Sequence, residues 1–292
     1  MLPASDYAEK RLQRYKKICK LQTFFLILQK IYALMIRFKP FNTACLSLLL
    51  LMSTACTSHY QLTGIARSRM VIDSRYDAQP DLQAQTFIAP YKHVVDSVMG
   101  PVLGEVAHNM AAKRPESDLS NLLADILVWA APEYGEQPVL GVYNMGGIRA
   151  ELAMGKVTYG DVLDIAPFEN KISFTTLTGE QLLKLFRQIA HRGGEGVSKG
   201  TELVISSKGE LLSARLHGKE IDPKADYRVT TIDYLLQGND GMSAMSEGTN
   251  IVSPKEERNN TRFIIMNYFK EKQSKGLVVD SKVEGRIVVR NE

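Results

Sequence analysis

The spacing of apolar residues changes repeatedly along the chain after residue 85, and this change limits the folds open to it. Between Gln85 and Ala111 apolar residues recur three and four positions apart, as on one face of a helix, until Gly100-Pro101 interrupts the pattern. Helical patterns also cover 116–135, 179–192 and 260–272, and strand-like runs cover 138–144, 201–207, 211–218, 226–236 and 278–290. The order predicts one mixed α/β domain of the α+β class, with helices packed on a mixed sheet that contains β-hairpins.

Short polar signals mark where these elements begin and end. Ser117 or Asp118 can cap the start of the helix at 116–135, and Pro132 stops it. Glycine-containing turns at 208–209 and 217–219 connect strands that we expect to be antiparallel. Residues 193–196 contain three glycines, so we expect them to form a flexible loop.

Basic residues are concentrated at the front of the chain. Nine of the 36 Lys and Arg, but only two of the 32 Asp and Glu, lie in residues 1–56. The rest of the chain is therefore slightly acidic, which argues against a nucleic-acid backbone as the partner. The three cysteines, Cys19, Cys45 and Cys56, also lie in this front part, so the rest of the chain has no disulfide and no thiol nucleophile. Such a domain depends on its apolar core, which this length allows.

Residues 35–56 have the features of a signal peptide. Arg37 and Lys39 precede a short apolar run, and small residues precede Cys56. The run is shorter than the roughly 20 residues of a membrane-spanning helix. The tetrapeptide STAC at 53–56 resembles a bacterial lipobox, which predicts lipidation of Cys56 and a lipid-anchored protein of the bacterial cell envelope, on its periplasmic or cell-surface face. The alternative is an ordinary signal peptide followed by a buried cysteine.

The segments on either side of this signal are not part of the predicted domain. Residues 1–34 place a basic and an apolar segment ahead of a complete signal, so we expect translation to begin at Met35; a genuine upstream helix at the membrane surface is the alternative. Residues 57–85 are expected to be a polar tether with an entry strand near 60–71, where apolar and polar residues alternate. The folded domain is then predicted to cover residues 86–292.

The sequence carries no constellation that predicts a metal or another cofactor in this chain. The five histidines are too far apart to share a ligand set by local spacing, and no H-x-H, D-x-H or H-E-x-x-H motif occurs. A G-x-S-x-G nucleophile elbow and a P-loop are absent too. A Ser/His/Asp triad without such an elbow stays open, and what stands out is a set of loop residues with binding chemistry.

The stretch YNMGGIRAEL, residues 143–152, has the composition of a binding loop. Asn144 offers an amide that both donates and accepts hydrogen bonds. Gly146 and Gly147 permit backbone conformations closed to other residues, and Arg149 provides a planar donor for a phosphate or carboxylate. The alternative is a turn between two strands with an arginine on the surface.

Two further stretches carry aromatic side chains beside polar ones. In YLLQGNDGMSAM, Gly238 and Gly241 flank Asp240, whose carboxylate suits two vicinal hydroxyl groups, and Tyr234 precedes them. In APFEN, Phe168 follows a proline. Two aromatic rings on loops can stack on the two faces of a planar base. Phe168 as part of the core is the alternative.

Taken in order, these stretches resemble the C-terminal domain of the bacterial and animal 5′-nucleotidases, a family that includes UDP-sugar hydrolases and 2′,3′-cyclic phosphodiesterases. The stretch NMGGIRAELAMGKVTYGDVLDIAPFENKISFTTLTGEQLLKLF is similar to the family's N-x-G-G-I-R, P-F-x-N and L-T-G-x-x-L motifs. KRPESDLSNLLADIL, GKEIDPKADYRVTTIDYLLQGNDGM and the closing VEGRI resemble the motifs on either side. The resemblance covers about residues 86–288.

The resemblance implies a nucleoside-binding domain and a role for each matching residue. Asn144 and Arg149 hold the polar part of the substrate, with Arg149 near phosphate or ribose. Phe168 and Tyr234 stack on the base, and Asp240 accepts from the ribose hydroxyls. The substrate-binding set it implies is Asn144, Gly146, Gly147, Arg149, Phe168, Asn170, Tyr234, Gly238 and Asp240, with Lys113 as an anion contact where the family has an arginine.

The family's hydrolysis depends on an N-terminal metallophosphatase domain with two metal ions, and its metal-binding motifs do not occur in this sequence. Three interpretations follow. The chain is the substrate-binding subunit of a split nucleotidase, completed by a separately encoded metallophosphatase that carries the divalent metals. Alternatively, it is a stand-alone nucleoside- or nucleotide-binding lipoprotein. The third interpretation is a remnant that binds no ligand.

Overall fold

The computed structural model describes residues 24, 26–32, 64, 66–76 and 81–291, and the chain divides into two units, Met1–Asp77 and Ala78–Glu292. The predicted signal segment 35–56, with Cys56, lies outside the described residues. In the first unit, residues 26–32 are helical and η1 spans Ser74–Tyr76. Residues 66–73 carry no strand, so the part of the predicted entry strand that is described does not form. Within the described residues, none of the helices has the length and apolar character needed to span a membrane.

The second unit begins with helix α3, Leu82–Met99, whose start is capped by Asp81. The Asp81 carboxylate accepts hydrogen bonds from the backbone N–H groups of Gln83 and Ala84. The helix therefore starts before the predicted domain boundary at residue 86. The helix ends at Met99, as the interruption at Gly100-Pro101 predicted, and the chain continues into a strand, β1 (Val102–Val106). β1 pairs antiparallel with β3, Gly155–Thr158.

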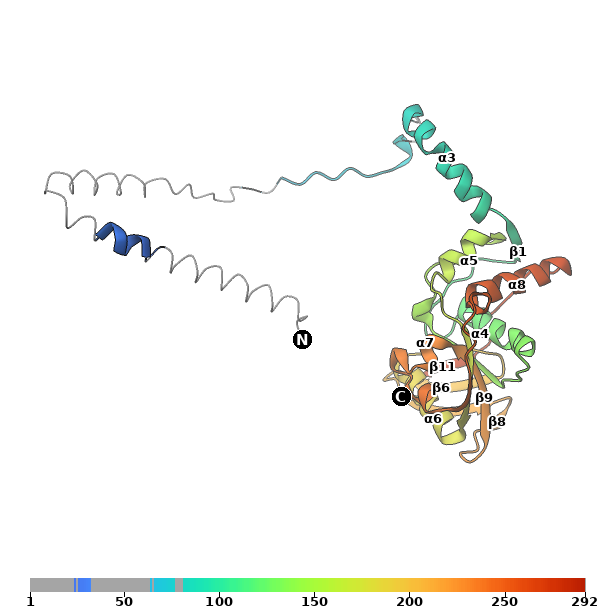
Figure 1. Ribbon diagram of the computed structural model, residues 1–292. Helices are drawn as coiled ribbons and strands as arrows, with labels where there is room; N and C mark the ends of the chain where they lie inside the picture. The colour runs from blue at the N-terminus through green and yellow to red at the C-terminus, as the bar shows by residue number, and fades with distance from the viewer. Residues whose placement is uncertain (1–23, 25, 33–63, 65, 77–80, 292) are drawn as a thin grey trace, which may run out of the picture. The chain divides into compact units, whose positions relative to one another are not determined.

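The second unit, which Figure 1 shows from α3 to the C-terminus, has a five-stranded mixed sheet at its centre. The order of its strands is β10-β4-β9-β2-β5. Its strands are β2 (Leu140–Tyr143), β4 (Ile172–Thr178), β5 (Gly196–Val197), β9 (Asp226–Ile232) and β10 (Thr249–Val252). β2 runs parallel to β9, while β4 is antiparallel to β9 and β5 is antiparallel to β2. The ends of β2 and β9 therefore lie at the same edge of the sheet as the starts of β4 and β5.

A second sheet has the order β11-β6-β7-β8. It contains β6 (Thr201–Ser206), β7 (Leu211–Leu216), β8 (Lys219–Glu220) and β11 (Ile287–Arg290). The two predicted turns connect β6 to β7 and β7 to β8, and both pairs of strands are antiparallel, as expected. β11 pairs with β6 in parallel. The α+β class, with helices on mixed sheets and β-hairpins, is confirmed.

The domain also contains the helices α4 (Asp118–Ala130), α5 (Tyr159–Ile165), α6 (Gly179–His191), α7 (Asp233–Leu236) and α8 (Thr261–Ser274), with short 3-10 turns η2 (Ala131–Tyr134), η3 (Met145–Gly147), η4 (Asn239–Gly241), η5 (Ser243–Glu247) and η6 (Glu257–Asn259). Three of these helices pack on the five-stranded sheet (α4, α6 and α7), and two pack on the β1–β3 pair (α5 and α8). Ser117 caps α4 through a capping box with Ser120. α4 packs so closely on β2 that a Cβ at Gly141 would lie 2.5 Å from the carbonyl oxygen of Ala124.

The strand predicted over 226–236 stops at Ile232, because Asp233 opens the single turn α7. The prediction of a longer strand was wrong, because the apolar residues 234–236 belong to this turn. The turn matters for the site, since it redirects the chain and places Tyr234 and the glycines that follow at the edge of the sheet.

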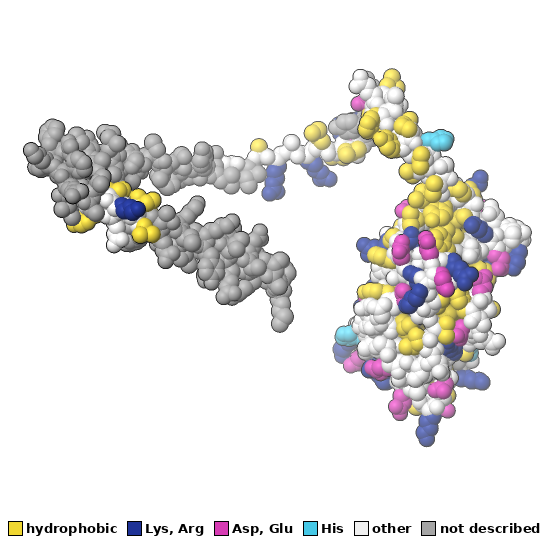
Figure 2. All heavy atoms as spheres, viewed as in Figure 1, with side chains coloured by type: hydrophobic (Ala, Val, Ile, Leu, Met, Phe, Trp, Pro, Cys, Tyr) yellow, Lys and Arg dark blue, Asp and Glu magenta, His cyan; other side chains and the backbone are white. Residues whose placement is uncertain are grey.

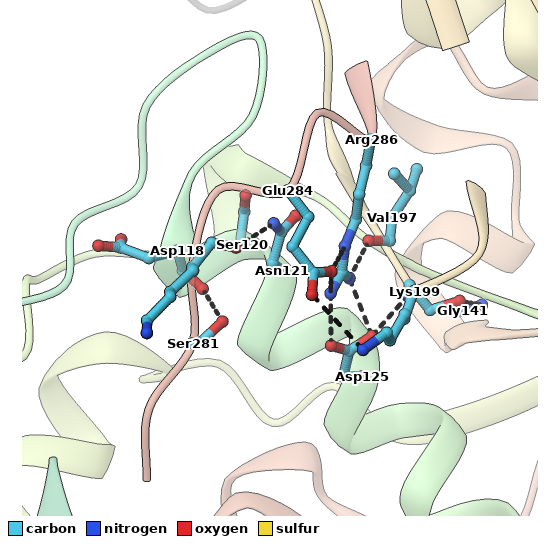
Figure 3. A network of polar contacts seen from close by, with 12 residues as sticks. Asp118, Ser120, Asn121, Asp125, Gly141, Val197, Lys199, Ser281, Glu284 and Arg286 are labelled. Carbon is cyan, nitrogen blue, oxygen red and sulfur yellow. Dashed lines mark hydrogen bonds and ion pairs between the residues drawn. The ribbon is translucent and has the colours of Figure 1, made fainter. Parts of the chain in front are cut away.

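A buried arginine joins the C-terminal segment to the rest of the domain (Figure 3). Arg286 is 4% exposed and donates from both terminal nitrogens to the Asp125 carboxylate, at 2.9 and 2.8 Å. It also contacts Glu284 and the carbonyl oxygen of Val197. The arginine of the VEGRI motif therefore connects α4, β5 and the start of β11.

Candidate functional site

The loops that carry the predicted binding residues meet at one edge of the five-stranded sheet. Asn144 follows the end of β2, and Tyr234 and Asp240 follow the end of its parallel neighbour β9. Phe168 lies just before β4, whose first residue Ile172 pairs with the last residue of β9, Ile232. Strand direction therefore brings three loops from distant parts of the sequence to the same place.

Asn144 is the buried centre of the first loop. It is 4% exposed, and its Nδ2 donates to Asp240 Oδ2 at 2.7 Å. Its Oδ1 is buried and accepts no hydrogen bond from the described residues. A Cβ on Gly147 would lie 2.6 Å from this oxygen, so only glycine leaves the amide in place. The amide therefore has one fixed donor and one free acceptor.

Asp240 is held in an uncommon backbone conformation. Its φ is 55° and its ψ is 26°, in the left-handed region, and it lies between Gly238 and Gly241, which also have positive φ. The Tyr234 hydroxyl donates to Asp240 Oδ1 at 3.3 Å. The charge of Asp240 is also the main cause that raises the pKa of Tyr234, which stays neutral as a donor. Residues held in such sparsely populated backbone conformations cluster at binding sites.

A buried glutamate supports this arrangement and was missed in the sequence. The Glu195 side chain has no exposed surface, so residues 193–196 are not the flexible loop that their glycines suggested. Its Oε2 accepts from the Met145 backbone N–H at 2.6 Å, and its Oε1 accepts from Arg192 Nε at 2.6 Å and from Arg114 Nη2. The second terminal nitrogen of Arg192 lies 3.7 Å from Asp240 Oδ2. No local pattern in the sequence distinguishes this glutamate from a surface one.

The remaining predicted residues lie around this centre without contacting it directly. Arg149 is exposed and donates to the Gly146 carbonyl oxygen at a long 3.4 Å. Phe168 is 48% exposed rather than buried in the core, so its ring is free to stack on a ligand. Asn170 is half-buried and its carbonyl oxygen accepts from Thr261. Lys113 is exposed and, among the described residues, makes no hydrogen bond or ion pair.

A cavity of about 310 Å³ lies beside this centre, between α6 and η4. Asp240 and Gly241 line one side, and Arg187, His191 and Arg192 line the other. Arg114, next to Lys113 in the sequence, donates from Nε to the Gly194 carbonyl oxygen at 2.9 Å. The surroundings of Asp240 are therefore basic, and they come from α6 and the loop before α4 rather than from the predicted Lys113.

The part of the chain that the structure describes has no group of three or more His, Cys, Asp or Glu side chains that could hold a metal ion. The described residues therefore do not fit the two-metal centre of the nucleotidase family. The groups that the site offers are an amide, a carboxylate and two exposed aromatic rings.

Comparison with known proteins identifies the family of this domain. Residues 100–247 match the model of a family described as "5'-nucleotidase, C-terminal domain". The chain belongs to this family. All of the predicted binding residues, from Lys113 to Asp240, lie inside the matched region.

The similar proteins are longer than this chain. Protein UshA of Yersinia enterocolitica is 27% identical over 154 residues, which are 51% of this chain and 27% of UshA. The trifunctional nucleotide phosphoesterase protein YfkN of Bacillus subtilis is 25% identical over 240 residues, 75% of this chain and 16% of YfkN. The crystal structure of a 5′-nucleotidase precursor from Thermus thermophilus matches 74% of this chain and 45% of its own, with a TM-score of 0.62 and 25% identity. The chain spans about a quarter or less of the two curated relatives, UshA and YfkN.

Proposed function

We propose that this chain is the nucleoside- or nucleotide-binding subunit of a split 5′-nucleotidase-type phosphohydrolase, which acts in nucleotide catabolism. The observation that carries the proposal is the hydrogen bond from Asn144 to Asp240, with Tyr234 on the same carboxylate, at the edge where the loops after β2 and β9 meet. These residues stand in the motifs of a family whose members include the UshA and YfkN proteins.

The chemistry of these groups suits a nucleoside. Vicinal ribose hydroxyls are donors, and the Oδ1 atom of Asp240 has only the long contact with Tyr234 as its partner among the described residues. The free Oδ1 of Asn144 can accept a further hydrogen bond from the ligand. Phe168 and Tyr234 are exposed aromatic rings on neighbouring loops, available to stack on a base. Arg149 is exposed on the same loop as Asn144, and its guanidinium group suits a phosphate.

Hydrolysis in this proposal is supplied by a separate phosphoesterase chain that holds the divalent metals. Helix α3 supports the existence of such a partner. None of its residues is buried, and its apolar side chains, including Phe87, Ile88, Tyr91 and Val95, are exposed (Figure 2). An exposed face with several neighbouring apolar side chains is typical of an interaction site. α3 also ends where the matched C-terminal family region begins, at residue 100.

The alternative is a stand-alone nucleoside- or nucleotide-binding lipoprotein without catalysis. Its support is that Asn144, Tyr234, Asp240 and Glu195 all come from one chain, so the contacts need no second protein. The same contacts argue against a remnant that binds nothing. In both cases we propose attachment to the cell envelope through a lipid on Cys56.

Calorimetry with residues 78–292, which form a compact unit with its own core, tests the binding proposal. We expect adenosine and AMP to bind, and Asp240→Ala to weaken both. A matched control is Glu210→Ala, an exposed carboxylate on the turn before β7. No heat of binding with either ligand at millimolar concentration would overturn the proposal.

A second experiment separates the two functions. The reading frames beside this gene are searched for a two-metal phosphoesterase, and that protein is mixed with residues 78–292, AMP and Mn²⁺. The split enzyme predicts phosphate release that needs both chains. Binding of AMP without a neighbouring phosphoesterase, or without any gain in phosphate release on mixing, favours the stand-alone binding protein.

A further inference from the structure

The Asp240 carboxylate is fixed by a chain of charges that begins in the protein interior. Glu195 has no exposed side-chain surface, and a buried carboxylate must be compensated by hydrogen bonds and opposite charge. Its compensation comes from the Met145 N–H and from two arginines, Arg114 and Arg192. Glu195 is thereby tied to the loop after β2 as well as to the end of α6.

Arg192 connects this buried carboxylate to the one at the ligand site. Its Nε donates to Glu195 at 2.6 Å, and its Nη2 lies 3.7 Å from Asp240 Oδ2. The guanidinium group is planar and rigid, so fixing Nε on Glu195 also fixes the direction of Nη2, which lies on the same edge of the group. The positive charge of Arg192 therefore faces the Oδ2 atom of Asp240.

The two carboxylate oxygens of Asp240 differ in how strongly the protein holds them. Oδ2 accepts from Asn144 Nδ2 at 2.7 Å and faces Arg192, whereas Oδ1 has only the 3.3 Å contact with the Tyr234 hydroxyl among the described residues. The backbone of Asp240 is left-handed, so the residue keeps this position only while its surroundings hold it. Oδ1 is the oxygen left for a ligand.

We propose that Arg192, anchored by Glu195, is a positioning residue that orients Asp240 toward a vicinal diol and so makes the site selective for ribonucleosides over nucleosides without the diol. The inference rests on the proposed nucleoside-binding function. It assigns to Arg192 and Glu195 a role in ligand choice, although neither residue needs to touch the ligand.

The test compares adenosine with 2′,3′-dideoxyadenosine, which lacks both hydroxyls, by calorimetry on residues 78–292. The wild-type protein is expected to bind adenosine about 10-fold more tightly, the range of a hydrogen bond to a charged group. Arg192→Ala should lower adenosine affinity to near that of the dideoxynucleoside and leave the affinity for the dideoxynucleoside unchanged. The matched control is Arg215→Ala, an exposed arginine on β7 that does not line this cavity, which should change neither.

Two further variants separate orientation from charge and from folding. Arg192→Lys keeps the charge but lacks the fork that reaches both carboxylates, so it should lose the preference like Arg192→Ala. Glu195→Gln keeps the size of the buried side chain and should reduce the preference, with a circular dichroism spectrum like the wild type.

Each outcome bears on one claim. If Arg192→Ala weakens both ligands equally, or neither, or if Arg192→Lys keeps the full preference, the positioning role is wrong. Wild-type protein that binds both nucleosides equally also contradicts it, while the proposed function stands. Wild-type protein that binds neither contradicts the proposed function, and this inference with it.

Discussion

Asn144 and Asp240 stand 96 positions apart in the sequence and are joined by a hydrogen bond of 2.7 Å between Asn144 Nδ2 and Asp240 Oδ2. The bond connects the loop after β2 with the loop after β9, two strands that run parallel and end at the same edge of the sheet. It is the contact on which the account of the site depends.

Removal of this amide should weaken ligand binding. Asn144→Ala frees Asp240 Oδ2 and removes the buried acceptor Oδ1, so we expect adenosine affinity to fall by about 10-fold, as for the loss of a hydrogen bond to a charged group. Calorimetry measures the change, with Asn291→Ala, an exposed asparagine near the C-terminus, as the control. Equal affinities of wild type and Asn144→Ala would show that the amide takes no part in binding.

Phe168 should contribute through stacking. Phe168→Ala is expected to reduce adenosine affinity by about 1–3 kcal/mol, the range measured for base–aromatic stacking. Phe87→Ala on α3 is the control, because Phe87 is also exposed, at 71%, and does not belong to the site. An unchanged affinity in Phe168→Ala would remove this ring from the pocket.

Tyr143, the last residue of β2, should make stability depend on alkaline pH. Burial raises its pKa from 10.0 to about 12. The folded protein thus binds this proton more tightly than the unfolded chain, so the stabilisation is fully present below pH 10 and is lost as the pH rises toward about 12. Between pH 8 and pH 11 the wild type should lose about 1 kcal/mol more than Tyr143→Phe. Urea unfolding at the two pH values checks this, and parallel losses in both proteins would contradict it.

Arg286 should affect folding more than binding. Arg286→Ala leaves the partly exposed Asp125 and Glu284 without their shared partner and the Val197 carbonyl oxygen without its side-chain donor, so we expect a loss of about 1–3 kcal/mol of stability (Figure 3). Arg290→Ala, which removes an exposed arginine at the end of β11, should cost little. Thermal unfolding compares them. Similar melting temperatures for the two variants would show that the network is not needed for the fold.

Phosphate release measures whether this chain hydrolyses nucleotides alone. Residues 78–292 with AMP and Mn²⁺ should release no phosphate, because the described residues offer no metal-ligand cluster. A colorimetric phosphate assay is sufficient, with a complete 5′-nucleotidase as the positive control. Metal-dependent turnover by this chain would overturn the assignment of catalysis to a second protein.

The local pattern of the sequence predicted most of the elements but not the way they meet. The apolar periods place α4, α6 and α8, and Ser117 marks the start of α4. Tyr234 was assigned to a strand because the apolar run continues past Ile232, and only the structure shows that Asp233 begins a helical turn. Family motifs pointed to Asn144 and Asp240, whereas their contact depends on strand directions that no short stretch encodes.

The burial of Glu195 and its contacts with two arginines could not be predicted from the sequence. Glu195 lies between glycines, where a charged residue is usually solvated. Its burial depends on Arg114, 81 positions away in the sequence, as well as on Arg192, three positions before it. The exposure of α3 could not be predicted from the sequence either, because its apolar periodicity predicts a face packed on a core. That face has no cover in the described residues.

The most direct test of the central claim is a crystal structure of residues 78–292 with adenosine. The account predicts the base beside the rings of Phe168 and Tyr234 and the ribose hydroxyls on Asp240 Oδ1. Adenosine bound elsewhere on the domain, with the Asn144 and Asp240 side chains not in contact with it, would contradict the claim that this edge of the sheet is the nucleoside site.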